Sequence, residues 1–339
     1  MTADIEIRYA TPDDVDQIAA LYDRVYDGGY PLTECTDSAL IRRIVTNREH
    51  VWVLALDGDM VVGASVARPE PVNRSYELCR GVVRPDYRGR ANYGAVFDLS
   101  VRAALEQPDC EVVYIYARSG RALRIFNRAR PPLCWTGTDG GMHPVAGERE
   151  EHVFGMAFNP EQVVTRIVPP RSIVAEDSAV AHQIAGLNSV IRTGDYPSRI
   201  AAGGAAEFTY ESDCGRVSFS VFEPSRAALV GAVEGDTPDD IRRVLWEVID
   251  GAAPSKIEHM TVYVLADKPP VIAALCSADT DDSKGRFAVR GYLPGWHNDG
   301  DVRYDCVSLA AYTGEQIPRR LGFEDRIEAI YRSFPSKFR

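Results

Sequence analysis

The alternation of apolar and polar positions predicts a strand followed by two helices at the start of the chain. Residues 5–8 form an expected strand, and Thr11-Pro12-Asp13-Asp14 follows it. Threonine is a favourable N-cap, proline fits the first helical position and acidic residues suit the first turn, so this run predicts a helix start. A second helix is expected over residues 38–45. The first helix has its apolar residues at helical spacing, namely Val15, Ile18, Tyr22 and Val25.

The chain from residue 51 to residue 158 predicts a sheet with helices beside it. The apolar runs 51–56 and 61–67 flank the turn Asp57-Gly58-Asp59, which is typical of a β-hairpin. Further strands are expected at residues 76–83, 112–117 and 151–158, and a short helix at 121–129. A longer helix should precede the strand at 112–117, because one face of it gathers Phe97, Val101, Ala104 and Leu105.

The second half repeats the later part of this order. A helix containing Ile241, Leu245 and Val248 precedes a strand at 261–266, as the Phe97 helix precedes the strand at 112–117. A short helix and a last strand at 302–310 complete the copy. This self-similarity and the length of 339 residues favour two tandem domains, each a mixed α/β unit. We expect domains at 1–160 and 176–339, joined by a linker at 161–175 that carries two adjacent prolines.

Composition excludes several classes of protein. The formal net charge of −11 disfavours nucleic-acid binding, which needs a basic face. No apolar run approaches the roughly 18 residues of a membrane span, and the N-terminus lacks the pattern of a signal peptide. The seven cysteines are scattered without CxxC spacing, and the six histidines form no metal-like cluster. We therefore expect a cytoplasmic protein with reduced thiols, without a metal and without a membrane partner.

The segment from Gly81 to Gly94 carries the strongest chemical signal. A predicted strand ends in Gly81-Val82-Val83, a turn rich in arginine and glycine follows, and a helix begins. Such a turn presents unpaired main-chain N–H groups and the positive end of the helix dipole to an anion. The segment therefore predicts a site for a diphosphate. The turn and helix start that would hold it consist of Arg88, Gly89, Arg90, Ala91, Asn92, Tyr93 and Gly94.

This segment resembles the acyl-CoA loop of the GCN5-related N-acetyltransferase (GNAT) superfamily, Arg/Gln-x-x-Gly-x-Gly/Ala after the fourth strand. Arg88 falls on the first position of that motif, Ala91 on its first glycine and Tyr93 on its last small residue. The order of elements across residues 5–158 is also similar to that family. The resemblance implies that the backbone of Gly81, Val82 and Val83 pairs with the pantetheine arm of acetyl-CoA or another acyl-CoA, and that the amides of residues 89–94 take the pyrophosphate.

Two departures from the family pattern bear on activity. Tyr93 places a large side chain where the family has a small one. The family often has Asn-x-x-Ala-x-x-x-Tyr after the fifth strand, where this chain has Ser119, Ala122 and Phe126. Phe126 has no hydroxyl group, so the usual acid that protonates the leaving thiolate is missing and the acid stays unassigned.

Acyl transfer to an amine needs a base and a polarised thioester carbonyl. Glu77, on the predicted strand before the loop, is the leading base, and the alternative is that it is a surface residue. The rival hydroxyl groups belong to Tyr93, Tyr114 and Tyr116, which can equally be packing residues of the sheet.

The second half is expected to have lost the acyl-CoA site. At the matching helix start Thr237 should act as N-cap, with Asp240 three residues later. The carboxylates of Asp236, Asp239 and Asp240 would repel a phosphate there. In that half Asp305 is expected to pair with Arg303.

The sequence therefore predicts a tandem GNAT-like N-acyltransferase whose acceptor is a small-molecule amine, bound between the domains. Two alternatives stay open. One takes its acyl group from an acyl-carrier protein or an aminoacyl donor. The other is a non-catalytic CoA-binding or regulatory protein that has kept the fold.

Overall fold

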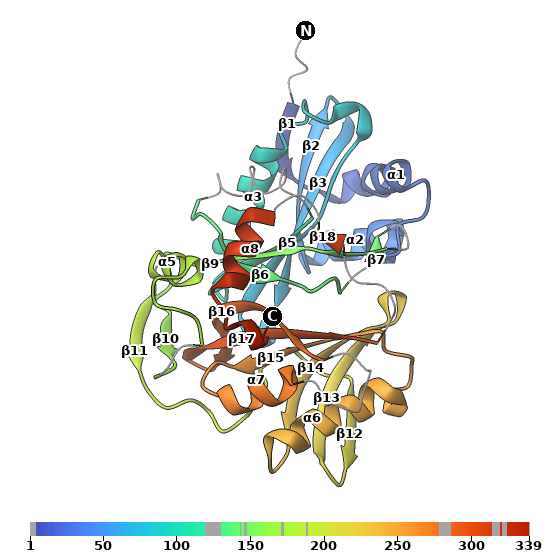
Figure 1. The fold of residues 1–339 in the computed structure, drawn as a ribbon. Helices are drawn as coiled ribbons and strands as arrows, with labels where there is room; N and C mark the ends of the chain where they lie inside the picture. The colour runs from blue at the N-terminus through green and yellow to red at the C-terminus, as the bar shows by residue number, and fades with distance from the viewer. Residues whose placement is uncertain are drawn as a thin grey trace. The chain divides into compact units, whose positions relative to one another are not determined.

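The computed structural model describes residues 5–118, 130–142, 144–145, 148–170, 173–187, 189–277, 286–313, 319–320 and 324–338 (Figure 1). Its contacts divide the chain into two compact units. The first unit takes in Met1–Ile115, Arg121–Leu133 and Met156–Gln162, and the second Tyr116–Gly120, Cys134–Gly155 and Val163–Arg339. The helix expected at 121–129, with Ser119, Ala122 and Phe126, lies outside the described residues.

The first unit is a sheet with helices on both faces. Its strands run in chain order, antiparallel from β1 to β4, and β5 then pairs with β4 in parallel. The elements are β1 (Ile5–Tyr9), α1 (Val15–Tyr26), α2 (Ser38–Asn47), β2 (Val51–Asp57), β3 (Met60–Glu70), β4 (Ser75–Val83), α3 (Tyr93–Leu105) and β5 (Val112–Ala117, whose last two residues group with the second unit). Short 3₁₀ turns precede several of them, at Pro12–Asp14, Thr33–Cys35, Pro71–Asn73 and Pro85–Tyr87.

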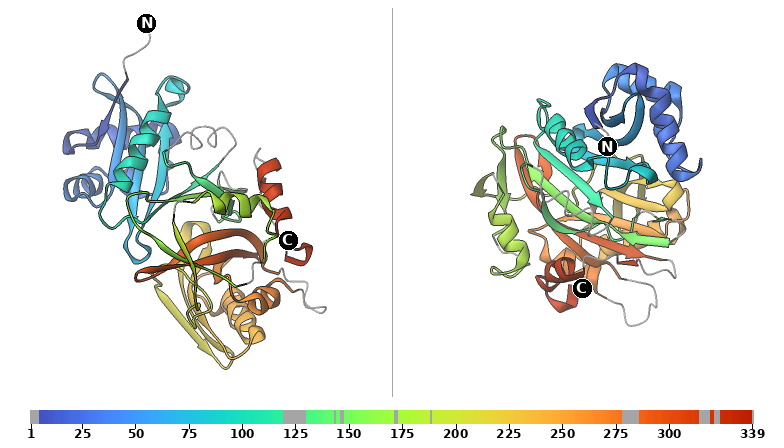
Figure 2. Two further views of the ribbon diagram at one scale, coloured as in Figure 1. Left: turned by 90° about the vertical axis from the view of Figure 1, so that its left-hand side faces the viewer. Right: turned by 90° about the horizontal axis from the view of Figure 1, so that it is seen from above.

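Alternation along the strands assigns each face of this sheet to its own helices. Trp52, Leu54 and Leu56 of β2 join one buried cluster with apolar residues of α1 and α2. Val53 and Ala55, which point to the other face, join a second cluster with α3. Figures 1 and 2 show α1 and α2 on one side of the blue strands and α3 on the other. The strands and helices expected between residues 5 and 117 are confirmed.

The second unit is a larger mixed sheet. Its order is β6-β16-β17-β15-β14-β13-β12, β10 pairs with β17 and β11, and β18-β8-β7 form a separate small sheet. Helices α6 and α7 pack against each other (Figure 2). The strands are β6 (Cys134–Thr138), β7 (Pro144–Val145), β8 (Glu148–Glu151), β9 (Val153–Phe158, whose last three residues group with the first unit), β10 (Thr165–Val168), β11 (Val190–Thr193), β12 (Phe208–Ser212), β13 (Gly215–Phe222), β14 (Ala227–Glu234), β15 (His259–Leu265), β16 (Ala288–Asp299), β17 (Val302–Tyr312) and β18 (Arg319–Arg320). The helices are α5 (Ala179–Ala185), α6 (Pro238–Glu247), α7 (Pro269–Cys276) and α8 (Glu324–Arg332).

One detail of the first unit recurs in the second. Arg74 has a left-handed backbone with φ 44° before β4, and its guanidinium bonds Glu111 at 2.8 Å. Arg226 has φ 47° before β14 and bonds Glu258 at 2.6 Å. In both places the glutamate N–H also donates to the arginine carbonyl, at 2.9 and 2.8 Å. The repeated detail supports the tandem arrangement, whose expected boundaries at 160 and 176 stay a prediction.

The segment 161–175, which the sequence predicts as a linker, contributes a strand to the sheet of the second unit. Strand β10 lies in this segment, is rich in β-branched residues, and pairs in parallel with both β17 and β11. Asp305, which was expected to pair with Arg303, forms a buried ion pair with Arg166 of β10 at 2.7 Å. The guanidinium of Arg303 donates to the carbonyl groups of Gly295 and Trp296. This long-range pairing between β10 and β17 could not be read from the spacing of Arg303 and Asp305 alone.

Candidate functional site

Strands β4 and β5 of the first unit separate part-way along their length. They pair at three successive positions, the last of which joins Glu77 to Tyr114. β4 then continues to Val83 beside β3, while its pairing with β5 has ended. Main-chain groups need hydrogen-bond partners, so a gap between two strands suits an extended ligand that can supply them.

A β-bulge lies in β4 beside this gap. The register passes from Ala64↔Val82 to Val66↔Cys79, so Arg80 and Gly81 together oppose the single residue Ser65. Arg80 has a left-handed backbone with φ 54°, a conformation that costs a residue other than glycine about 1–3 kcal/mol.

Three side chains hold Arg80 in this conformation. Its buried guanidinium pairs with Glu34 and lies 3.3 Å from Nδ1 of His50, and Tyr22 binds its main-chain carbonyl. Burial and the nearby arginines lower the pKa of His50 to about 4. Since Arg80 can only donate, the neutral imidazole accepts at Nδ1 and carries its proton on Nε2. Strain held in place by surrounding contacts is typical of functional sites.

The turn after β4 is built around Tyr87. Its ring is buried and lies against the guanidinium groups of Arg84 and Arg90, with 4.8 Å from ring centre to Arg90. Its hydroxyl donates to Asp57, and its carbonyl accepts from the amides of Arg90 and Ala91. These contacts fix the shape of the loop. The amides of Arg90 and Ala91, which the resemblance implies for a phosphate, are already bonded to the Tyr87 carbonyl.

The remaining amides of the turn stay available at the start of α3. Gly89 and Asn92 have positive φ angles of 84° and 46°, and the side chain of Asn92 makes no capping bond. Within the described residues, the amides of Gly89, Asn92, Tyr93 and Gly94 have no main-chain partner. Arg88 is exposed beside them. An uncapped helix start with an arginine next to it is suited to an anion.

Tyr93 turns inward from the first turn of α3. It packs with the apolar cluster under the helix and hydrogen-bonds Ser65 of β3. A Cβ atom on Gly81 would lie 2.0 Å from its hydroxyl oxygen. A side chain at position 81 would therefore overlap the hydroxyl group of Tyr93. Burial raises the pKa of Tyr93, so its hydroxyl keeps its proton at neutral pH.

Four ionisable side chains gather at the position where β4 and β5 stop pairing. Arg68 lies opposite Glu77 in the register, and Glu77 lies opposite Tyr114. The guanidinium of Arg68 binds Glu77 at 2.6 Å and Glu70 at 2.7 Å. Tyr114 hydrogen-bonds Glu70. Burial and the charge of Glu77 raise the pKa of Glu70, although Arg68 opposes that shift.

Sequence reasoning missed Glu70, Arg68 and Arg80. The expected strand ended at residue 67, so Arg68 and Glu70 lay outside it. In the structure β3 continues to Glu70, and both residues keep its pairing with β4. The bulge at Arg80 has no recognisable sequence signal, because an arginine in a strand does not predict a left-handed backbone.

A cavity of about 290 Å³ opens beside α2 in the first unit. Leu32, Leu40 and Ile44 supply apolar surface, and Glu34 and His50, which hold Arg80, supply polar groups. The cavity therefore offers room for a small molecule beside the residues that hold the bulge.

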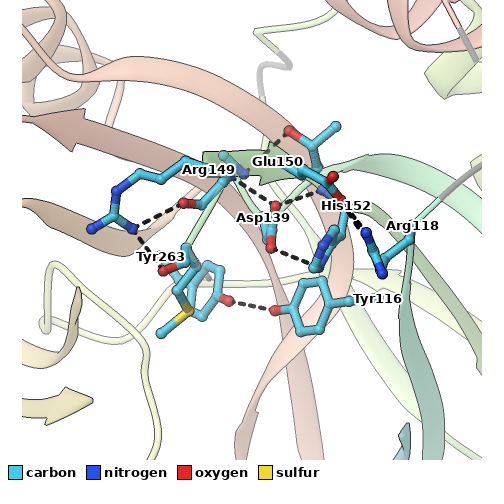
Figure 3. A network of polar contacts seen from close by, with 11 residues as sticks. Tyr116, Arg118, Asp139, Arg149, Glu150, His152 and Tyr263 are labelled. Carbon is cyan, nitrogen blue, oxygen red and sulfur yellow. Dashed lines mark hydrogen bonds and ion pairs between the residues drawn. The ribbon is translucent and has the colours of Figure 1, made fainter. Parts of the chain in front are cut away.

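Figure 3 shows a polar network of the second unit. The hydroxyl groups of Tyr116 and Tyr263 lie 3.0 Å apart, so Tyr116 is engaged there rather than beside Glu77. Nδ1 of His152 lies 3.4 Å from Asp139, and burial lowers the pKa of His152 to about 4.

In the second unit, the helix start that corresponds to α3 is capped by its own side chains. The hydroxyl of Thr237 accepts from the amide of Asp240 at 3.1 Å and donates to the carboxylate of Asp240 at 2.7 Å. The expected N-cap is confirmed. It also places the carboxylate of Asp240 at the helix start.

One group of described residues has metal-ligand spacing. Asp213, Cys214 and Glu247 in the second unit place their ligand atoms within 4.8 Å of one another. Burial raises the pKa of the Cys214 thiol, which opposes the thiolate form that metal ions bind. We assign no metal to this group.

No protein-family model and no curated protein matches the chain. None of the helices that the structure describes has the length and apolar content of a membrane span.

Solved structures of GNAT acetyltransferases are similar to a little under half of the chain. An acetyltransferase of the GNAT family from Streptococcus pneumoniae has a TM-score of 0.39 and 14% identity, over 46% of this chain and 99% of its own. NAA60 from Arabidopsis thaliana, solved with a bisubstrate analogue, has a TM-score of 0.38 and 16% identity, and the match covers 45% of this chain and 97% of its own. Ribosomal-protein-S5-alanine acetyltransferase from Vibrio fischeri has a TM-score of 0.39 and 8% identity, and the match covers 46% of this chain and 94% of its own. TM-scores below 0.5 carry no argument about the function of this chain.

Proposed function

We propose that the first unit binds an acyl-CoA and transfers its acyl group to an amine. The observation that carries the proposal is the separation of β4 from β5 beside the Arg80 bulge, leading to the uncapped start of α3. The gap suits an extended arm with amide groups, and the helix start suits a diphosphate at its end. Gly81, Val82 and Val83 line the arm, and Arg88 with the amides of Gly89, Asn92, Tyr93 and Gly94 takes the diphosphate.

The transfer requires one bond to form and one to break. The amine nitrogen attacks the thioester carbonyl carbon, the C–S bond breaks, and the amine gives up a proton while the thiolate takes one. Glu77 and Glu70 are the two candidate bases, and the raised pKa of Glu70 favours it as a proton acceptor. Tyr114, hydrogen-bonded to Glu70, is the candidate acid. The cavity beside Glu34 and His50 is a candidate place for the acceptor.

The first experiment is calorimetric titration with acetyl-CoA. The wild type should bind saturably, and a variant carrying Arg88→Ala and Arg90→Ala should bind at least about tenfold more weakly, because it loses charge beside the diphosphate. Arg102→Ala, on the exposed last turn of α3, is the matched control and should bind as the wild type does. Equal affinity in all three proteins would refute the proposed diphosphate site.

The role of Glu77 is tested separately from binding. Glu77→Gln should reduce turnover of an amine acceptor with little loss of acetyl-CoA affinity. Unchanged turnover would remove Glu77 from the mechanism and leave Glu70 as the base.

Two other functions are distinguished by the same titration. Weak binding of free acetyl-CoA together with transfer from an acyl-carrier protein would indicate a carrier-dependent enzyme. Tight binding without transfer to any amine would indicate a regulatory protein. We further propose that the second unit is a degenerate copy of the first, on the strength of the repeated Arg74–Glu111 and Arg226–Glu258 pairs.

A further inference from the structure

The second unit has a strand gap of the same design as the first. β14 and β15 pair in parallel at three successive positions, the last of which joins Leu229 to Thr261. β14 also carries a bulge, since its register with β13 passes from Ala232 to Val230 and leaves out Gly231. Parallel pairing that stops after three positions, beside a bulge, therefore occurs in both units (β14 and β15 are labelled in Figure 1).

A segment of the second unit itself lies in this gap. We call residues 200–206 the closing segment. Ala201 forms an antiparallel bridge with Val264 of β15. On either side of it, the amide of Ala202 donates to the carbonyl of Tyr263 at 2.7 Å, and the amide of Leu265 donates to the carbonyl of Ile200 at 3.1 Å. The closing segment thus takes the main-chain groups of β15 that β14 no longer reaches.

The other side of the closing segment packs on the bulge of β14. A Cβ atom on Gly203 would lie 2.1 Å from the carbonyl oxygen of Val230 and 2.8 Å from the Cα atom of Gly231. Ala201 and Ala202 are buried, with 0% and 2% of their surface exposed. The sequence Ala-Ala-Gly-Gly-Ala-Ala at 201–206 has side chains small enough for this approach, because a larger group at Gly203 would strike the backbone of β14.

The first unit differs at the same place. Among its described residues, no strand or bridge takes up the side of β4 that β5 leaves after Glu77. Its helix start is uncapped, whereas that of the second unit is capped by Thr237. Both features needed for an extended anionic ligand are present in the first unit, and both are filled by the chain itself in the second.

We propose that the closing segment is a built-in strand that permanently occupies the ligand gap of the second unit, so that the chain binds a single acyl-CoA, in the first unit. The prediction of one acyl-CoA per chain rests on the proposed function, whereas the occupation of the gap by the closing segment does not. The second unit then acts as a structural partner whose gap is closed to any extended ligand.

The occupation of the gap is tested without any ligand. Hydrogen exchange of the wild-type protein should show the amides of Ala202 and Leu265 protected to the level of the β15–β17 ladder. Gly203→Ala should lower the Tm of the second unit by about 4 °C or more, because its methyl group overlaps the β14 backbone. Gly204→Ala is the matched control, since nothing lies within 4 Å of its Cβ position, and should shift the Tm by less than about 1 °C.

The count of sites is tested by titration with acetyl-CoA. One site per chain, lost in the Arg88→Ala, Arg90→Ala variant, supports the proposal in full. Two sites per chain would overturn it, as would fast exchange at Ala202 or equal Tm values for the two glycine variants. If acetyl-CoA does not bind at all, the proposed function fails, while the exchange and Tm results still decide whether the gap is closed.

Discussion

The hydroxyl group of Tyr22 donates a hydrogen bond of 2.5 Å to the main-chain carbonyl of Arg80. Tyr22 is fully buried on α1, and Arg80 is the left-handed residue of the β4 bulge. A planar trans peptide directs its carbonyl and its N–H to opposite sides. By drawing the Arg80 carbonyl towards α1, Tyr22 therefore directs the N–H of Gly81 away from α1. A helix from early in the chain thus fixes the shape of the candidate site.

Replacing Tyr22 with phenylalanine tests this dependence. Tyr22→Phe leaves the Arg80 carbonyl without its donor, so the free energy of unfolding should fall by about 1–3 kcal/mol. Turnover with acetyl-CoA should fall as well, because the bulge loses its anchor. Urea denaturation and a thiol-release assay measure the two effects. Tyr9→Phe, at a tyrosine that is 43% exposed, should change neither quantity, and equal losses in both variants would contradict the role of Tyr22.

The raised pKa of Glu70 predicts the pH dependence of transfer. A carboxyl group accepts a proton only when ionised, so kcat/KM should rise with pH through the pKa of Glu70, which lies above 4.5. Glu70→Gln removes this group and should lower kcat by about 10²-fold or more. The measurement is kcat/KM as a function of pH for the wild type, Glu70→Gln and Glu77→Gln. An acidic limb that survives in Glu70→Gln and disappears in Glu77→Gln would assign the base to Glu77.

The contact between Gly81 and Tyr93 predicts a coupled pair of substitutions. Gly81→Ala places a methyl group against the Tyr93 hydroxyl and should destabilise the protein by about 1–3 kcal/mol. Adding Tyr93→Phe removes the atom that clashes, and the nearest remaining ring atom would be 3.2 Å away. The double variant should recover more than half of the loss in chemical denaturation. Additive losses would show that the two residues do not compete for the same space.

The buried histidine His152 predicts a loss of stability in mild acid. Its pKa of about 4 in the folded protein lies below the ordinary value of 6.5, so the unfolded chain binds more protons between these values. Stability is therefore complete above about pH 6.5 and is lost as the pH falls towards 4. His152→Gln should flatten the dependence of Tm on pH in this window. A curve parallel to that of the wild type would show that His152 does not contribute.

The sequence by itself determined the local elements and the place of the candidate loop. Hydrophobic periodicity and the Thr11-Pro12 start signal gave the helices, and the Asp57-Gly58-Asp59 turn gave the hairpin, because these patterns depend on near neighbours in the chain. The N-cap at Thr237 was equally local.

The tertiary structure decided which groups meet. The left-handed Arg80 is held by Glu34, His50 and Tyr22, all distant in sequence, and the amides of Arg90 and Ala91 are taken by Tyr87. Whether a strand gap stays open is decided by chain segments far away, as the closing segment shows for β14 and β15. Such contacts follow from packing and hydrogen bonding between distant residues, and no local spacing encodes them.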